Sequence, residues 1–282
     1  MIELDAVTKI YTKGFLRRQK TIAVNNVSLS IKKGESVGLV GESGSGKTTL
    51  GRIALRLIEP TSGTVRLDGV NLTALSRSAL RQIRPRMQIV FQDPDTSLDP
   101  RMTVRECIAE PLKIWNLVKP HEQEDRVLEL LELVGLQQDL IGRYPFEISG
   151  GQKQRVALAR VLALKPGFIV ADEPTAALDL SVQAQILSLI KTVQKKTNLT
   201  LLFISHDLQV IGQMSDTVAV MHEGRIVERR STREILHTPQ DPYTKKLVVA
   251  AYESEAWLGK EPGRSFLNNT GNPLSKGFFR FE

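Results

Sequence analysis

The sequence predicts an α/β fold, and three stretches of the chain predict it. The apolar run Val37–Val40 is followed by a glycine-rich loop and then by a helical pattern over Thr49–Leu57. A second apolar run, Phe168–Asp172, ends in a carboxylate, and a third, Thr200–Ile204, is followed by serine, histidine and aspartate. Buried strands that end in polar residues are typical of a parallel sheet, whose carboxyl edge gathers a functional site.

The loop after the first run reads Gly-Glu-Ser-Gly-Ser-Gly-Lys-Thr over Gly41–Thr48, and we call it the phosphate loop. It fits a pattern whose backbone N–H groups and following helix N-terminus bind phosphates. Lys47 can reach the β- and γ-phosphates, and the Thr48 hydroxyl can ligate Mg²⁺. A glycine-rich turn with a stray lysine is the alternative. The predicted nucleotide-binding residues are Gly41, Ser43, Gly44, Ser45, Gly46, Lys47, Thr48 and Thr49.

Composition favours an ordinary globular protein. The chain has 282 residues and a formal net charge of +7. It lacks a run of about 18 apolar residues that would predict a transmembrane helix, and its first residues lack the apolar core of a signal peptide. The single cysteine, Cys107, excludes an internal disulfide and a cysteine-only metal site. Because the basic residues are dispersed, we expect no nucleic-acid partner.

The first third of the chain predicts further strands around the phosphate loop. Ile2–Lys9 and Ile22–Ile31 alternate apolar and polar residues, with a basic loop expected over Tyr11–Lys20. Tyr11 could stack on a purine, although a packing role is the more common one for a lone tyrosine. A short strand at Thr64–Leu67, a helix at Ser76–Ile83 and a strand at Met87–Phe91 are also predicted, the last ending at Gln92.

The middle of the chain is predicted to be helical. Thr103–Trp115 and Glu122–Val134 show helical apolar spacing. A further helix is predicted to begin at Ser149-Gly150-Gly151-Gln152, and its start could bind a second anion. An ordinary serine cap followed by a tight glycine turn explains those four residues equally well.

The strand Phe168–Asp172 predicts a second part of the nucleotide site. With a phosphate loop upstream, Asp172 is a candidate Mg²⁺ ligand, and Glu173 could orient or deprotonate an attacking water. A strand ending in a solvated acidic turn is the alternative. His206 follows the strand Thr200–Ile204, at the edge where a γ-phosphate contact would be useful, although a lone histidine there is usually structural.

The last part of the chain predicts a long helix through Lys196, a hairpin and short helices. The hairpin joins Val218–Met221 to Arg225–Glu228, and helices are expected at Thr232–Leu236 and Pro239–Ala251. Residues 252–282 are polar and rich in Gly, Pro and Asn, so we expect a weakly ordered tail.

Taken in this order, the pieces resemble the ATP-binding subunit of an ABC transporter. The phosphate loop corresponds to the family's Walker A motif, and Phe168–Asp172 corresponds to its Walker B strand. The resemblance implies an ATPase with the following residues in these roles: Glu173, His206 and Gln92 in catalysis; Thr48, Gln92 and Asp172 at Mg²⁺; Tyr11 against adenine; and Ser149, Gly150, Gly151, Gln152 and Asp179 at the ATP of a neighbouring subunit.

Within that family the chain resembles the dipeptide and oligopeptide importer branch, which also contains nickel and other metal-chelate importers. The resemblance rests on Phe91–Arg101, Asp172–Gln185 and Pro239–Leu247. Three positions depart from the branch pattern: Ile148 replaces a leucine, and Phe146 and Asp241 each stand where a histidine is usual. None of these changes removes a catalytic group.

The resemblance also implies the architecture and the partners. We expect residues 1–251 to form one ABC ATPase domain, a P-loop NTPase core with an antiparallel β subdomain and a helical insert at about 93–160. The implied cofactors are ATP and Mg²⁺. The implied partners are a second ATPase subunit, expected to form a heterodimer although a homodimer stays open, two membrane permeases, and an extracellular or periplasmic solute-binding protein. The implied location is the cytoplasmic face of the cell membrane, with a soluble non-transport ATPase as the alternative.

Overall fold

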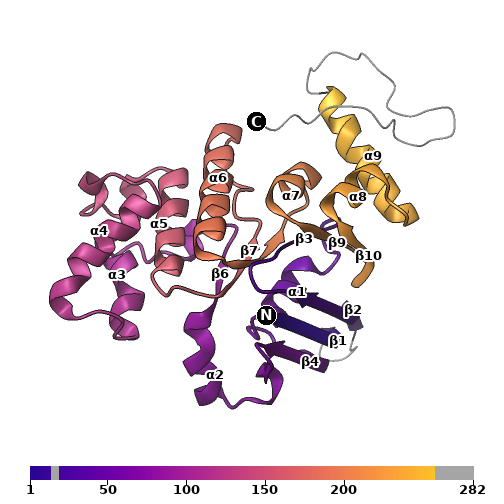
Figure 1. The fold of residues 1–282 in the computed structure, drawn as a ribbon, viewed down its shortest axis with the longest axis horizontal. Coiled ribbons are helices and arrows are strands. Elements are labelled where there is room, and N and C mark those ends of the chain that lie inside the picture. The colour runs from indigo at the N-terminus through magenta and orange to yellow at the C-terminus, as the bar shows by residue number, and fades with distance from the viewer. Residues whose placement is uncertain (14–18, 258–282) are drawn as a thin grey trace.

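The computed structural model describes residues 1–13 and 19–257, and it confirms the predicted α/β class. A six-stranded sheet has the order β10-β9-β3-β8-β7-β6 (Figure 1). Its strands are β3 (Ser36–Val40), β6 (Met87–Val90), β7 (Phe168–Asp172), β8 (Thr200–Ile204), β9 (Thr217–His222) and β10 (Arg225–Ser231). All neighbours run parallel except β9 and β10. The carboxyl ends of β3, β6, β7 and β8 therefore lie along one edge.

The two faces of this sheet pack against different helices. In β8, Leu202 and Ile204 join the same hydrophobic cluster as the residues of α1 (Lys47–Ala54). The alternate residues Leu201 and Phe203 join the cluster that contains α6 (Leu180–Thr197) and α7 (Leu208–Met214). Because successive strand residues point to opposite faces, a continuous apolar run is what a strand covered on both sides requires.

A second, antiparallel sheet has the order β2-β1-β4-β5. Its strands are β1 (Ile2–Lys13), β2 (Gln19–Ile31), β4 (Ser62–Leu67) and β5 (Val70–Asn71). The expected basic loop over Tyr11–Lys20 is wrong at both ends, because residues 11–13 pair with residues 19–21 and extend the two strands. Backbone pairing satisfies the N–H and C=O groups there, whatever the charge of the side chains.

Helices between β6 and β7 form a separate group on one side of the molecule (Figure 1). They are α3 (Val104–Ile114), α4 (Gln123–Leu133) and α5 (Gly150–Leu162), whereas α2 (Arg77–Ile83) precedes β6. Thr103 caps α3 in a reciprocal arrangement with Glu106, which fixes where that helix begins. Helices were predicted at all four places.

The last described elements, α8 (Thr232–His237) and α9 (Pro242–Trp257), lie beside β10. The helix α9 continues past residue 251, where the tail was expected to begin. Residues 258–282 lie outside the described residues, and a weakly ordered tail stays a prediction for them. In the part of the chain that the structure describes, no helix combines the length and apolar character needed to cross a membrane.

Candidate nucleotide site

The phosphate loop joins the end of β3 to the start of α1, as predicted. Gly46 is the N-cap of α1 and has φ 106°, a conformation that favours glycine. A Cβ at Gly46 would lie 2.1 Å from the carbonyl oxygen of Ala23, and one at Gly41 would lie 2.0 Å from that of Met221. Both glycines are therefore required by close backbone contacts. The first amides of α1 are left free of a side-chain cap, which suits an anion.

Lys47 is folded back over this loop. Its side chain is buried, and Nζ donates to the carbonyl oxygens of Gly41 at 2.7 Å and Glu42 at 2.8 Å. Burial lowers the pKa of Lys47, and the carboxylates of Glu173, Asp172 and Glu42 partly oppose that shift. An ammonium group held by neutral carbonyls can exchange those contacts for phosphate oxygens.

The remaining residues of the loop differ in exposure. Ser43 and Gly44 are exposed, and Thr49 is half-buried in the first turn of α1. The hydroxyl of Ser45 is buried and has no hydrogen-bond partner among the described residues. Because a buried polar atom without a partner is rare, Ser45 is open to an acceptor or donor from a ligand.

One hydrogen bond joins the phosphate loop to the end of β7. The Thr48 hydroxyl donates to Oδ1 of Asp172 at 2.9 Å. Asp172 is 6% exposed, and this burial raises the pKa of its carboxyl, while the bond from Thr48 opposes the shift. Two oxygen ligands so close together fit Mg²⁺, which prefers oxygen and is usually held by few protein groups. Residues 1–13 and 19–257 hold no group of three or more His, Cys, Asp or Glu side chains able to bind a metal.

Glu173 and His206 lie together beside that pair. Nδ1 of His206 and Oε1 of Glu173 are 3.1 Å apart, with the histidine side chain 62% exposed and the glutamate side chain 20% exposed. The Glu173 N–H donates to the carbonyl of Ile204 at 3.0 Å, which ties the two strand ends together. Glu173 has φ 48°, a strained value for a residue with a side chain, and such strain clusters at functional sites.

Gln92 lies just beyond the neighbouring strand, at the same edge of the sheet. It is exposed and follows β6, whose Val90 pairs with Ala171 of β7. The sheet register thus places Gln92 alongside Asp172 and Glu173. The predicted catalytic and metal residues come from neighbouring strands, as the carboxyl edge of a parallel sheet requires.

The residues predicted to meet a neighbouring subunit's ATP lie elsewhere. Ser149 caps α5: its hydroxyl accepts from the Gln152 N–H at 3.3 Å, and the Gln152 side chain accepts from the Ser149 N–H at 2.9 Å. Asp179 caps α6 by a single bond, in which its carboxylate accepts from the N–H of Val182. Figure 1 places α5 with α3 and α4, away from α1. Within one chain the two predicted anion sites are therefore separate.

Tyr11 lies near the end of β1 with its side chain on the surface. Its ring is 40% exposed, and the ammonium of Lys9 lies 5.2 Å from the ring centre. A strand position leaves an aromatic face available, as stacking on adenine would need.

Tyr243 contacts the phosphate loop, and no pattern in the sequence indicated this contact. The N–H of Glu42 donates to the hydroxyl of Tyr243 at 3.0 Å, from helix α9. The segment Pro239–Leu247 was singled out only as a resemblance. A contact across 201 residues has no local signal in the sequence.

Comparison with known proteins identifies relatives over most of the chain. Residues 24–176 match the protein family described as ABC transporter. The chain is 46% identical to a putative peptide import ATP-binding protein of Brucella ovis, over 95% of this chain and 86% of that protein. It is 47% identical to a dipeptide transport ATP-binding protein of Lactococcus lactis, over 88% of this chain and 80% of the relative.

Solved structures share the fold. A dimeric ATP-binding cassette, MJ0796, in a post-hydrolysis state with ADP and phosphate, is similar with a TM-score of 0.74 and 34% identity, over 83% of this chain and 99% of that one. The protein cbiO1 from Clostridium perfringens, part of the transporter complex cbiONQ, is similar with a TM-score of 0.74 and 28% identity, over 91% and 97% of the two chains.

Proposed function

This chain belongs to the ABC transporter family, and from that premise we propose that it hydrolyses ATP to energise import of di- or oligopeptides. The hydrogen bond between Thr48 and Asp172 carries the proposal, because it joins the phosphate loop to the acidic strand end in one site. The relatives named for peptide or dipeptide transport support the cargo.

Binding of ATP would use the groups that the phosphate loop leaves available. Backbone N–H groups of the loop and the Lys47 ammonium would contact the phosphates. Thr48, Asp172 and Gln92 would hold Mg²⁺, which when bound neutralises charge on the β- and γ-phosphate oxygens. Tyr11 would provide a face for adenine.

Hydrolysis would use the pair beside that site. In the proposed reaction, Glu173 orients a water and accepts its proton as the water oxygen bonds to the γ-phosphorus. The bond from that phosphorus to the β–γ bridging oxygen breaks, and the products are ADP and phosphate. His206, whose Nδ1 lies 3.1 Å from Oε1 of Glu173, would contact the γ-phosphate through an imidazole N–H.

The proposed partners follow from the separation of the phosphate loop and the Ser149 segment within a single chain. A second ATPase subunit, expected to form a heterodimer with this chain, would receive the Ser149–Gln152 segment and Asp179 at its own ATP, and would supply its corresponding segment to the ATP of this chain. Two permeases, served by an extracellular or periplasmic solute-binding protein, would hold the pair at the cytoplasmic face of the cell membrane. A groove of about 250 Å³ beside Gln92, lined by Phe91, Ile114, Trp115 and Arg160 among others, supports docking of a permease segment.

Uptake by cells carrying Glu173→Gln at the native locus tests the proposal. We expect uptake of labelled dipeptide or oligopeptide to fall at least about 100-fold, the usual contribution of a general base, while radioactive nickel uptake is unchanged. Glu223→Gln is the matched control, because Glu223 is exposed and has a similar φ of 45° in the turn before β10.

The three cargoes separate the competing functions. Loss of nickel uptake alone would replace the peptide assignment with metal import and leave the catalytic assignments in place. Unchanged uptake of all three, with both variants expressed to the wild-type level, would contradict the proposed transport function. Retained ATP turnover by the Glu173→Gln complex would show that another group is the base.

A further inference from the structure

The C-terminal helix α9 touches the phosphate loop through one tyrosine. The Tyr243 hydroxyl accepts a hydrogen bond from the N–H of Glu42 at 3.0 Å. Its ring stacks on His222, with ring centres 3.8 Å apart and planes 23° apart. Burial raises the pKa of Tyr243, so the phenol stays a neutral hydroxyl near pH 7. The contact therefore fixes both the ring and the oxygen of this side chain.

Lys47 also holds Glu42, the residue that Tyr243 contacts. The Glu42 N–H donates to Tyr243, and the Glu42 carbonyl accepts from Lys47 Nζ at 2.8 Å. If Lys47 exchanged that carbonyl for a phosphate oxygen, the hydrogen bond to Tyr243 would remain as a side-chain restraint on Glu42. A restraint that orders the loop before the ligand arrives lowers the entropy lost on binding.

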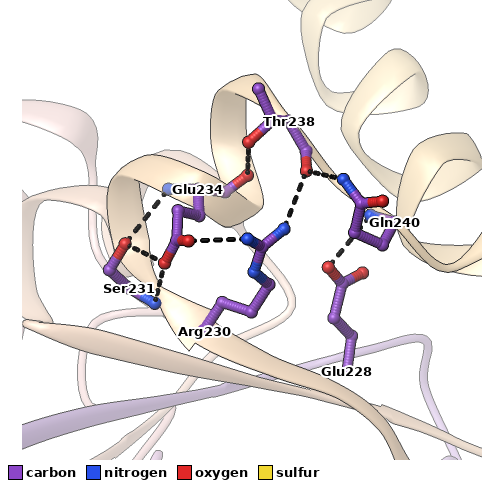
Figure 2. Close-up of polar contacts among 6 residues, drawn as sticks. All are labelled: Glu228, Arg230, Ser231, Glu234, Thr238 and Gln240. Atoms are coloured by element: carbon purple, nitrogen blue, oxygen red, sulfur yellow. Dashed lines mark hydrogen bonds and ion pairs between the residues drawn. The ribbon is translucent and has the colours of Figure 1, made fainter.

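The segment that carries Tyr243 is anchored by a buried carboxylate. Glu228 of β10 is 8% exposed and accepts the N–H groups of Gln240 at 2.9 Å and Asp241 at 3.0 Å. Asp241 in turn accepts the N–H of Tyr243 at 2.8 Å. Figure 2 shows Glu228 reaching the backbone of Gln240. A buried carboxylate aimed at two successive backbone donors determines where α9 begins.

A second network in Figure 2 holds the turn that leads to this anchor. Arg230 pairs with Glu234 at 2.6 Å and also donates to the Thr238 carbonyl at 3.3 Å. Ser231 caps α8 through Glu234. Side-chain hydrogen bonds thus hold the turn between β10 and α8 and the turn between α8 and α9. These contacts fix the position of α9 and therefore of Tyr243.

We propose that Tyr243 is a positioning residue for the phosphate loop, through which the anchored C-terminal segment raises the affinity of this chain for ATP. The inference rests on the proposed ATP site and adds a residue to it. Tyr243 touches no reacting atom, and its effect passes through the Glu42 backbone.

Tyr243→Phe tests this, because it removes the hydroxyl and keeps the ring on His222. We expect the Kd for MgATP, measured by isothermal titration calorimetry on the full-length chain, to rise about 2- to 10-fold, the loss expected for one neutral hydrogen bond. In the assembled transporter the KM for ATP should rise while kcat stays unchanged. Tyr252→Phe is the control, since it makes the same change about 13 Å farther along α9.

A double-mutant cycle separates positioning from general loosening. Glu228→Gln should weaken ATP binding in the wild-type background and have no further effect in the Tyr243→Phe background, because both act through one contact. An unchanged Kd in Tyr243→Phe would overturn the inference. A lower unfolding temperature of the nucleotide-free Tyr243→Phe protein would also overturn it, if this loss of stability fully accounted for the weaker ATP binding. Failure of the wild-type chain to bind MgATP would instead contradict the ATP site itself.

Discussion

At the scale of single residues, Asp172 is a proposed Mg²⁺ ligand whose charged form is disfavoured by burial. Its carboxyl is buried at the end of β7, and Thr48 is the side chain that donates a hydrogen bond to it. Burial raises the pKa of this group, so the folded protein holds its charged form at a cost. Functional groups often lower stability in this way.

Asp172→Asn should stabilise the nucleotide-free protein while it abolishes ATP turnover. The amide oxygen still accepts the bond from Thr48, and the buried charge is removed. We expect a rise in unfolding temperature of up to about 4 °C at pH 7, the shift that 1 kcal/mol produces in a domain of this size. The measurement is thermal unfolding, with exposed Asp139→Asn as the control.

The sign of the pH dependence provides the check on this prediction. Because the folded-state pKa of Asp172 lies above its unfolded value, the wild-type protein loses stability as pH rises from the unfolded to the folded pKa. The advantage of the asparagine variant should therefore grow across that window and be absent below it. A difference that does not vary with pH would show that the carboxyl charge is not its cause.

The sequence patterns predicted which residues form the candidate site, but they could not predict the local geometry of those residues. The phosphate-loop pattern predicted Lys47 and Thr48, and the strand pattern predicted Asp172 and Glu173. The left-handed backbone of Glu173, at φ 48°, has no signal in its residue type, because glycine and asparagine are the usual residues there.

At the scale of elements, the contact between α5 and α6 explains a glycine that has two possible roles. Ser149-Gly150-Gly151 was compatible with an anion site and with an ordinary cap, and the structure shows Ser149 as a cap. Gly151 is also a packing residue: a Cβ there would lie 2.4 Å from Cγ1 of Val182 on α6. At Gly150 the nearest atom would be Cδ2 of Leu178, at an ordinary 3.5 Å.

Gly151→Ala should therefore destabilise the protein, and Gly150→Ala should not. The β-branched Val182 has little rotational freedom, so overpacking there should cost about 1–3 kcal/mol. Gly150→Ala should change stability by at most about 1 kcal/mol. The free energy of unfolding of the purified chain in urea is the measurement for both variants.

Val182 provides the second arm of that experiment. In a Val182→Ala background the clash is removed, so Gly151→Ala should cost much less than it does in the wild type. If Gly151→Ala lowered the free energy of unfolding equally in both backgrounds, the cause would be the backbone conformation of Gly151 and not its contact with α6.

Elements were predictable where one strong pattern defined them. Strand β8 has the predicted bounds, Thr200–Ile204, because five consecutive residues are buried. Helix α7 (Leu208–Met214) was not predicted, since seven residues carry too few apolar repeats and its start depends on a cap from Asp207. The ends of β1 and β2 were missed because they depend on pairing with each other.

At the scale of the whole molecule, the two helix starts that are predicted to contact ATP lie apart in one chain. The phosphate loop lies at the start of α1, and the Ser149 segment lies at the start of α5 in the other helix group (Figure 1). Helix α5 is tied to the loop after Gln92, because Lys153 pairs with Asp95 at 2.7 Å and Gln154 donates to the Phe91 carbonyl at 3.4 Å. The Ser149 segment therefore belongs to the body that carries this loop.

Ser149→Arg should separate the binding of ATP from its hydrolysis. Within one chain Ser149 is remote from the phosphate loop, so the isolated variant should bind MgATP with the wild-type Kd. In the assembled transporter, turnover should fall about 10-fold or more, the range for hydrogen bonds to a charged group, because the neighbouring subunit's ATP loses its contacts with this segment. Calorimetry on the chain and phosphate release by the complex measure the two effects.

Weaker ATP binding by the isolated, folded variant would contradict the separation, since it would place Ser149 at the chain's own nucleotide. Normal binding with normal turnover would remove the segment from the ATP site altogether.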